Sequence, residues 1–269
     1  MTQSLAPKTG GHTFVVSAYK ESPYLEECVR SLLDQTVPGE VVIATSTPNP
    51  YIAGIAAKYE IPLFEHEGGE GIAGDWNYAL SCAGTSYATV AHQDDVYLPG
   101  YREKVIKALD KSKDPLIAFT KYAELRNGRE VVSNRNLRIK NLLLFPLKAR
   151  YFHGSRFIRR RILSMGSAIC CPSVTVNLDK VELPLFENNM KSNIDWQAWE
   201  KLSRMKGSFV YVPDILMEHR IHEDSTTTKI IGQSSRKGED IFMFRKFWPG
   251  WIANIIEHFY IKSEESNNL

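Results

Sequence analysis

The sequence has few cysteines and no long apolar run, and both shortages narrow the class of protein. No stretch approaches the roughly 20 uncharged apolar residues needed to span a bilayer, so a protein without a membrane span is expected. The four cysteines have no metal-ligand spacing, and the adjacent pair Cys170 and Cys171 could hardly bond to each other without strain. The thiols are therefore expected to be reduced, and the protein is expected to lie in the cytoplasm or at the inner face of the membrane. Residues 1–11 are polar, which predicts a flexible N-terminus and no secretory signal.

Acidic residues are missing altogether from residues 131–178. The whole chain is nearly balanced, with 33 basic and 31 acidic residues, so this cationic stretch belongs to an otherwise acidic protein. Its nine basic residues are Arg135, Arg138, Lys140, Lys148, Arg150, Arg156, Arg159, Arg160 and Arg161. Such an asymmetry predicts an anionic partner, namely nucleotide phosphates, lipid phosphates or a membrane surface, or else it is a solvated basic face. The chain has no recognised nucleic-acid-binding motif, so no nucleic-acid partner is expected.

Strand-like and helix-like segments alternate through residues 12–115. This alternation predicts an α/β fold with a Rossmann-like, mixed but mostly parallel sheet that is flanked by helices. Strands are expected at residues 12–18, 40–45 and 61–65, and a fourth ends at Asp94. The first helix is expected to begin at Ser22 and Pro23, as an N-cap followed by proline at the first helical position.

The second half of the same domain is expected to span residues 116–228. Asn127-Gly128 predicts a hairpin turn, because both positions of such a turn need a positive φ. A helix is expected over residues 195–205, followed by two short strands at 209–212 and 215–221. Residues 229–269 are expected to form a C-terminal helical extension that packs against the domain or offers a helix to a partner or membrane surface.

The strand before Val96 ends in two adjacent carboxylates, Asp94 and Asp95. Neighbouring carboxylates repel each other unless a cation lies between them. In a parallel sheet this position lies at the carboxyl edge, where ligands bind. The pair therefore predicts a site for Mn²⁺ or Mg²⁺, and its alternative is a solvated acidic turn.

Five segments, in order along the chain, resemble the glycosyltransferases of family 2, which have the GT-A fold. They are FVVSAYKESPYLEECVRSLLDQT (14–36), GIAGDWNYAL (71–80), HQDD (92–95), NIDWQAW (193–199) and MEHRIHEDST (217–226). The resemblance covers residues 12–228 and implies an inverting, metal-dependent enzyme. Such an enzyme moves a sugar from a nucleotide-sugar, with a UDP-sugar favoured, to a saccharide or lipid-linked acceptor in polysaccharide or glycoconjugate synthesis. It also implies that the C-terminal half forms the acceptor side.

The resemblance assigns roles to individual residues. Asp195 is expected to be the catalytic base, or a simple helix N-cap. Asp95 is expected to be the main metal ligand, with His222 as a further ligand and His219 as the alternative. Contacts to the nucleotide-sugar are expected from Ala18, Tyr19, Glu21, Thr45, Asp75, Asp94 and Arg220. Trp76 and Trp196 are expected either to stack on sugar rings or to belong to the core.

The basic segment has a further hypothesis attached to it. We expect Arg159, Arg160 and Arg161 to form a positive wall on the acceptor side that binds a phosphate-bearing acceptor or contacts a membrane peripherally. Oligomerisation is left open by the sequence.

One departure from the family pattern concerns the second strand. Residues 44–49 contain no acid where family members usually carry one that contacts the donor base, so the identity of the base is left open. The missing acid also keeps a non-catalytic, saccharide-binding relative as an alternative. A nucleotidyltransferase-like enzyme is the other alternative, although no Gly-rich phosphate loop follows the first strand.

Overall fold

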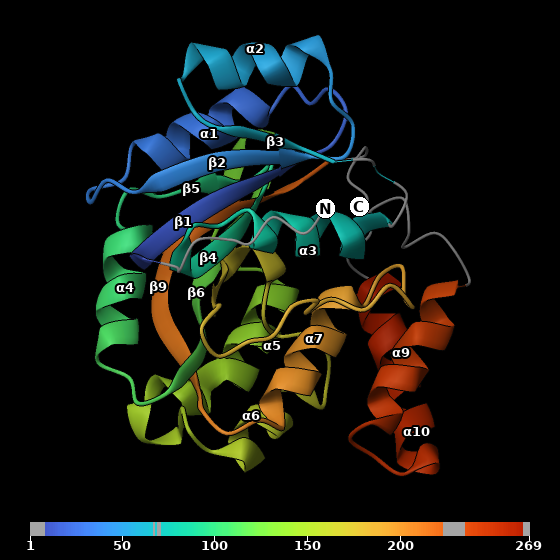
Figure 1. The fold of residues 1–269 in the computed structure, drawn as a ribbon. Helices are drawn as coiled ribbons and strands as arrows, with labels where there is room; N and C mark the ends of the chain where they lie inside the picture. The colour runs from blue at the N-terminus through green and yellow to red at the C-terminus, as the bar shows by residue number, and fades with distance from the viewer. Residues whose placement is uncertain (1–8, 67, 69–70, 223–234, 266–269) are drawn as a thin grey trace.

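The computed structural model describes residues 9–66, 68, 71–222 and 235–265. Within these residues nine strands form one sheet, in the order β3-β2-β1-β4-β8-β6-β9-β5, with β7 paired to β6 (Figure 1). The strands are β1 (Thr9–Ala18), β2 (Glu40–Thr45), β3 (Leu63–Glu65), β4 (Thr85–His92), β5 (Val96–Tyr97), β6 (Pro115–Arg126), β7 (Arg129–Val131), β8 (Val174–Asn177) and β9 (Ser208–Ile221). The helices are α1 (Leu25–Leu33), α2 (Pro50–Lys58), α3 (Gly71–Ser81), α4 (Tyr101–Asp110), α5 (Arg135–Leu144), α6 (Arg156–Leu163), α7 (Ile194–Ser203), α9 (Ser235–Arg245) and α10 (Gly250–Glu265). Three short 3₁₀ helices complete the described chain: η1 (Phe145–Lys148), η2 (Arg150–Phe152) and η3 (Cys171–Ser173).

The N-terminal half has the expected parallel, Rossmann-like arrangement. β1 pairs in parallel with β2 on one side and β4 on the other, and β2 pairs in parallel with β3. Beyond β4 the sheet becomes mixed, because β8 runs antiparallel to both β4 and β6, while β6 and β9 are parallel. The carboxyl ends of β1, β2 and β4 therefore meet at one edge of the sheet, where ligands bind in open α/β sheets.

Helices cover both faces of the sheet, and this explains why the middle of β1 carries apolar residues at consecutive positions, Phe14 to Val16. Phe14 and Val16 of β1 face a core that contains residues of α1, α2 and α4. Val15, between them, faces a second core that contains residues of α3, α6 and α7. Successive side chains of a strand point to opposite faces, so a strand buried on both sides needs an unbroken apolar run.

The predicted hairpin at Asn127-Gly128 is confirmed. Both residues have positive φ, at 50° and 73°, and they join β6 to β7 in antiparallel pairing. Asn tolerates the left-handed region and Gly lacks the Cβ that opposes it, so this dipeptide suits the turn.

The two short strands expected before residue 221 are one long strand, β9. Its pairing with β6 shifts register between Thr120 and Lys121, which lie opposite Val212 and Ile215. The extra residues, Pro213 and Asp214, are both exposed. Pro213 has no N–H to give to a ladder, so it sits at this irregularity without ending the strand.

The first helix begins later than predicted. α1 starts at Leu25, and Tyr24 occupies the N-cap position without a side-chain capping bond. Ser22 instead holds a preceding turn, because its Oγ accepts from the N–H of Tyr24 at 3.3 Å and its carbonyl accepts from Leu25 at 3.2 Å. Pro23 therefore lies in this turn, outside the helix.

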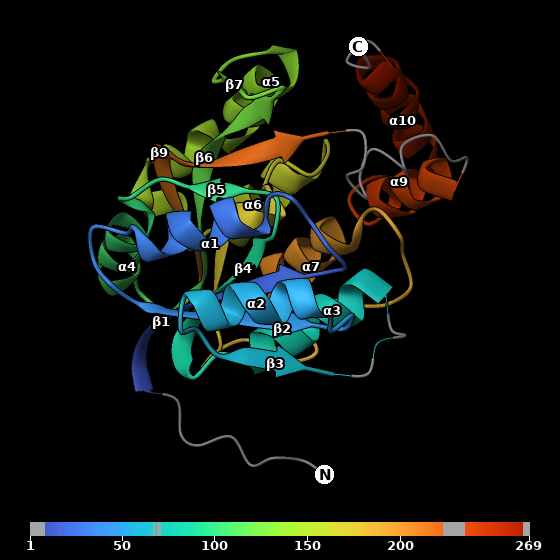
Figure 2. The ribbon, with the colours of Figure 1, turned by 90° about the horizontal axis from the view of Figure 1, so that it is seen from above.

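The C-terminal segment folds as a pair of helices at one corner of the molecule. α9 and α10 lie side by side in both views (Figure 1, Figure 2). Met243, Phe244 and Ala253 are fully buried in the core that α3, α6 and α7 share, so the expectation that this segment packs against the domain is confirmed for these residues. The expected boundary at residues 228 and 229 lies outside the described residues, as does most of the flexible N-terminus expected at 1–11. Among the described helices, none combines the length and the apolar character that crossing a membrane requires.

Candidate active site

The centre of the candidate site is the point where β4 ends beside the end of β9. β5 follows Asp95 directly and pairs antiparallel with β9, with Val96 opposite Glu218 and Tyr97 opposite Met217. This pairing brings the end of β9 to the Asp-Asp segment although the two lie more than 120 residues apart in the chain.

Asp95 is the most deeply buried carboxylate of this edge, with a residue exposure of 1 %. Its Oδ1 accepts from the backbone N–H of Arg220 at 2.9 Å and lies 2.9 Å from Nδ1 of His219. Its Oδ2 is buried and has no hydrogen-bond partner among the described residues. A buried polar atom without a partner is costly, so this oxygen is placed for a ligand that the protein itself does not supply.

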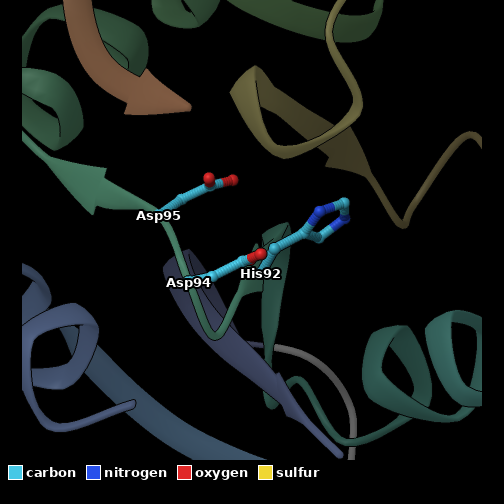
Figure 3. Close-up of side chains that lie close together, drawn as sticks. All are labelled: His92, Asp94 and Asp95. Carbon is cyan, nitrogen blue, oxygen red and sulfur yellow. The ribbon is translucent and has the colours of Figure 1, made fainter. Parts of the chain in front are cut away.

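Three side chains form a group that could hold a metal ion. One ligand atom each of His92, Asp94 and Asp95 lies within 4.8 Å of the others. Figure 3 shows these side chains projecting from the end of β4 to the same side. Two carboxylates and an imidazole are a suitable donor set for Mn²⁺, and the carboxylates alone suit Mg²⁺.

His92 is a ligand candidate that the sequence reasoning did not assign. Its ring stacks on Trp76, with centroids 5.0 Å apart, and its Nε2 is buried with no hydrogen-bond partner in the described part of the chain. Burial lowers the pKa of His92, which keeps the imidazole neutral with a lone pair available for a cation. The available signal was position alone, because His92 stands where a strict Asp-x-Asp motif would begin.

The two other histidines support the carboxylates. His222 Nε2 lies 3.0 Å from Asp94 Oδ2, and His219 holds Asp95 as described. Burial raises the pKa of Asp94, but the neighbouring histidines and the His222 hydrogen bond outweigh it, so the pKa lies below its ordinary value. His222 is thus beside the cluster, and its predicted direct ligation stays a prediction.

Arg220 ties three elements of the site together. Its Nε donates to the Asp94 carbonyl at 2.8 Å, its Nη2 donates to Glu27 at 2.6 Å, and its guanidinium lies 4.3 Å from the Tyr24 ring centroid. These contacts fix the end of β9 to α1 and to the Asp-Asp segment. The predicted contact between Arg220 and a donor diphosphate stays a prediction.

The expected nucleotide-binding residues gather at the ends of β1 and β2. Ala18 is buried at the end of β1, and Tyr19 and Glu21 are exposed just beyond it. The side chain of Gln93 pairs with Tyr19 in both directions, since the Tyr19 N–H donates to Oε1 and Nε2 donates to the Tyr19 carbonyl, each at 3.0 Å. This pairing joins the β1 loop to the Asp-Asp segment.

Thr45 and Asp75 are engaged within the protein. Thr45 is buried, and its hydroxyl accepts from the Thr47 N–H at 3.0 Å, which holds the turn after β2. Asp75, on α3, lies 3.4 Å from Nε2 of His66. Their contacts with a donor stay predictions.

Asp195, the expected base, is the second residue of α7 and is half-buried. Its Oδ1 accepts from the Trp196 N–H at 2.7 Å, and its Oδ2 lies 3.5 Å from the Ser167 hydroxyl. Burial raises the pKa of Asp195, while the backbone bonds at the helix start and the charge of Lys140 act in the opposite direction. A carboxylate with a raised pKa is better suited to accept a proton.

Asp95 and Asp195 both act electrostatically on the cysteine Cys171 in η3. Burial and both carboxylates raise the pKa of the Cys171 thiol, so this side chain lies within electrostatic reach of each acid. The predicted metal site and the predicted base thus flank one region of the molecule.

Lys140 and Tyr122 also belong to this region, and the sequence reasoning did not single them out. Lys140 Nζ donates to the Tyr122 hydroxyl at 2.9 Å, and the Tyr122 ring meets the edge of His219 with centroids 6.2 Å apart. A chain of contacts thus leads from Lys140, whose charge acts on Asp195, to His219 and Asp95. In the sequence Lys140 was one of nine basic residues, and nothing local distinguishes it.

Burial decides between the alternatives for Trp196, in favour of the core, and contradicts the expectation for Arg159. Trp196 is fully buried, and its Nε1 donates to the Leu163 carbonyl at 2.9 Å, so it belongs to the core and cannot stack on a sugar. Arg159 is also fully buried, with Nη2 donating to the Met205 carbonyl at 2.8 Å, so it cannot contact a membrane or an acceptor.

The other two arginines of that triplet are half-buried and bound inside the protein. Arg160 pairs with Glu200 at 2.6 Å, and the guanidinium of Arg161 lies 4.6 Å from the Trp248 ring centroid. The helical period separates three adjacent side chains by about 100° each, so they could not form one exposed wall.

Solved structures resemble this chain in fold. S. aureus TarS 1–349, in a complex with UDP-GlcNAc, is 15 % identical with a TM-score of 0.61, covering 92 % of this chain and 70 % of that one. The mannosyltransferase PcManGT from Pyrobaculum calidifontis, in a complex with GDP-Man and Mn²⁺, is 16 % identical with a TM-score of 0.60, covering 95 % of this chain and 72 % of that one. These likenesses confirm the expected GT-A fold.

Sequence comparison gives the family. An uncharacterized glycosyltransferase of Haemophilus influenzae is 21 % identical over 227 residues, which are 80 % of this chain and 66 % of that protein. The family model described as glycosyl transferase family 2 matches residues 13–177, more than half of the 269 residues. The match includes β1 from residue 13 onward, the glycine-led helix α3 and the His92–Asp95 cluster. The chain belongs to glycosyl transferase family 2.

Proposed function

We propose that this chain transfers a sugar from a nucleotide-sugar to a saccharide or lipid-linked acceptor, with a divalent metal ion and with inversion at the anomeric carbon. The observation that carries the proposal is the buried Oδ2 of Asp95, which lacks a partner among the described residues and lies beside His92 and Asp94. The neighbours with bound UDP-GlcNAc, and with bound GDP-Man and Mn²⁺, support the donor class and the metal.

The metal would be held by Asp95, Asp94 and His92, and when bound it would neutralise charge on the diphosphate of the donor. His219 and the Arg220 backbone orient Asp95 by holding its other oxygen. Ligand atoms fixed in this way before the ion arrives need little rearrangement on binding.

The donor's nucleoside would lie over the β1 and β2 ends, where Tyr19, Glu21 and the hydroxyl-rich turn after Thr45 surround an open edge. Because this turn carries no acid, hydroxyl and backbone groups would have to contact the base. UDP-sugars are the first donors to test, and GDP- and dTDP-sugars are the comparison.

In the transfer step the acceptor hydroxyl oxygen bonds to the anomeric carbon of the donor sugar as the bond from that carbon to the diphosphate breaks. Asp195 takes the proton of the hydroxyl, and the nucleoside diphosphate leaves with the bonding electron pair. A single displacement of this kind inverts the anomeric configuration.

The decisive experiment is donor binding and turnover with and without Mn²⁺. We expect one nucleotide-sugar class to stabilise the protein against heating only when Mn²⁺ is present, and to be hydrolysed or transferred slowly. At about 100 times its Kd, a true donor adds roughly 2.7 kcal/mol to the free energy of unfolding. Metal-dependent binding without turnover would favour the non-catalytic relative, and release of pyrophosphate from a free nucleotide would favour a nucleotidyltransferase.

A further inference from the structure

A concave site lies away from the carboxyl edge of the sheet. It is a groove of about 750 Å³ between α4, the η1–η2 segment and the first half of β9. Residues within 208–214 at the start of β9 line it, and at about 3.3 Å per residue His219 lies about 16 Å beyond the last of them along the strand. Figure 1 shows β9 rising beside α4 from the bottom of the molecule to the end where α1 lies. The groove has the volume of a small-molecule site, but it is separate from the candidate active site.

The lining of this groove is strongly cationic. Its basic residues are Lys104, Lys107, Lys111, Lys113, Lys148, Arg150 and Lys206. Its two carboxylates are already paired, because Asp214 lies 3.0 Å from Lys104 and Asp114 lies 3.5 Å from Lys180. The other six cations form no ion pair with a carboxylate among the residues that the structure describes.

These cations come from segments far apart in the sequence. Lys107 and Lys111 lie on and just after α4, Lys148 and Arg150 lie in the η1–η2 segment, and Lys206 precedes β9. All five are exposed, and like charges that face one another across the groove repel. A concave surface that focuses one sign of charge attracts ligands of the opposite sign.

The kind of cation points to phosphate. Six of the seven basic residues are lysines, whose ammonium groups act as point charges with rotatable donors and bind phosphate without a fixed geometry. The rim also carries Tyr151, which is 89 % exposed and offers a ring to the uncharged part of a ligand. Several phosphates within one ligand would engage several lysines at once.

We infer that this groove binds a ligand that carries several phosphate groups. Two sources share this chemistry, a soluble polyphosphorylated molecule and the headgroups of an anionic membrane. The inference does not depend on the transfer reaction, because none of the groove residues takes part in it.

The first test measures the binding of inorganic tripolyphosphate to the full chain by isothermal titration calorimetry at low ionic strength. The variant Lys107→Gln/Lys111→Gln/Arg150→Gln should bind it at least about tenfold more weakly, at roughly two- to fivefold per lost charge pair. The matched control is Arg30→Gln/Arg129→Gln/Lys201→Gln, which removes three exposed cations outside the groove and should bind like the wild type.

The second test separates the two sources by sedimentation with vesicles of equal parts phosphatidylglycerol and phosphatidylcholine. Co-sedimentation that the groove variant loses, and that tripolyphosphate competes away, identifies the headgroups. Tripolyphosphate binding without co-sedimentation identifies a soluble ligand. If the groove variant binds both probes as tightly as the control variant, the groove is no phosphate site and the inference is overturned.

Thermal unfolding of the same proteins gives a readout that does not need a ligand. Relief of repulsion should raise the melting temperature of the groove variant relative to its control at low ionic strength, and salt should remove the difference. Equal melting temperatures at low salt would show that these cations are not crowded, which contradicts the charge focusing on which the inference rests.

Discussion

Nδ1 of His219 lies 2.9 Å from one oxygen of Asp95, while the other oxygen of the same carboxylate is buried without a partner among the described residues. One side of the carboxylate is thus anchored and the other is presented to the site. This asymmetry is what a metal ligand needs, because the anchored oxygen fixes the direction of the second one.

Asp95→Asn should abolish metal-dependent donor binding and keep the fold. The amide oxygen can still accept from the Arg220 backbone, but the charge that attracts a divalent ion is lost. Thermal shift measurements with Mn²⁺ and the nucleotide-sugar should give stabilisation for the wild type and none for the variant. Asp179→Asn, exposed just after β8, is the matched control and should respond to Mn²⁺ as the wild type does. Unchanged Mn²⁺ dependence in Asp95→Asn would remove Asp95 from the metal site.

Asp195→Asn should lose transfer activity by a factor of about 10² to 10⁴, the usual contribution of a general base. The amide can still accept from the Trp196 N–H, so donor affinity and melting temperature should change little. In the wild type, activity requires the ionised carboxylate, and burial raises its pKa. Activity should therefore fall on the acid side at a higher pH than an ordinary Asp would produce. A fully active Asp195→Asn protein would contradict the base assignment.

Lys140→Met should shift the loss of activity at acid pH to a still higher pH. The positive charge of Lys140 opposes the effect of burial on Asp195, so removing it leaves the pKa of Asp195 higher. The pH profile of kcat/KM tests this, with Arg138→Met on the exposed part of the same helix as the control. A lower kcat with an unmoved profile would instead assign Lys140 to substrate contact.

Gln93→Leu should weaken donor binding and leave the metal site intact. The variant loses both hydrogen bonds to the Tyr19 backbone, so the β1 loop would be ordered only when the donor binds. We expect the donor KM to rise about three- to tenfold, as for the loss of one or two neutral hydrogen bonds. Gln93→Glu keeps the hydrogen-bond acceptor Oε1 but loses the N–H group. Its KM for the nucleotide-sugar should lie between those of the wild type and Gln93→Leu. An unchanged donor KM in Gln93→Leu would show that this pairing does not order the loop for the donor.

Arg159→Met should fold with a stability close to that of the wild type. The guanidinium is buried, burial lowers its pKa to about 10, and two of its nitrogens have no partner among the described residues. Methionine fills much of the same volume without the desolvation cost, so the change in free energy of unfolding should be within about 1.5 kcal/mol. Arg159→Ala should cost about 2–4 kcal/mol through the cavity it leaves. Chemical denaturation measures both, and equal losses would mean that the charge itself stabilises the fold.

Local sequence patterns predicted most strands of the sheet and the hairpin turn between β6 and β7. β2 has the predicted bounds, and the Asn127-Gly128 turn forms as expected, because these features depend on neighbouring residues. The start of α1 and the continuity of β9 were not predictable in this way. Ser22 can cap a helix or hold a turn, and Pro213 can end a strand or bulge from it, and only packing decides between them.

The candidate site was predictable in its acids and not in their partners. Asp94, Asp95 and Asp195 stand in recognisable segments, whereas the roles of His92, Lys140 and Gln93 follow from contacts that span 16 to 74 residues. A contact of this kind depends on strand register and on the direction of each side chain, and neither is written in local sequence.

The amino-acid sequence by itself determined the alternation of strands and helices and the order of the family motifs, since apolar periodicity and turn residues act within a few positions of the chain. Tertiary structure alone decided that His219 holds Asp95, that Arg159 is interior, and that lysines from three segments line one groove. The physical reason is that burial and electrostatic environment belong to the assembled surfaces around a residue, which form only when distant segments pack together.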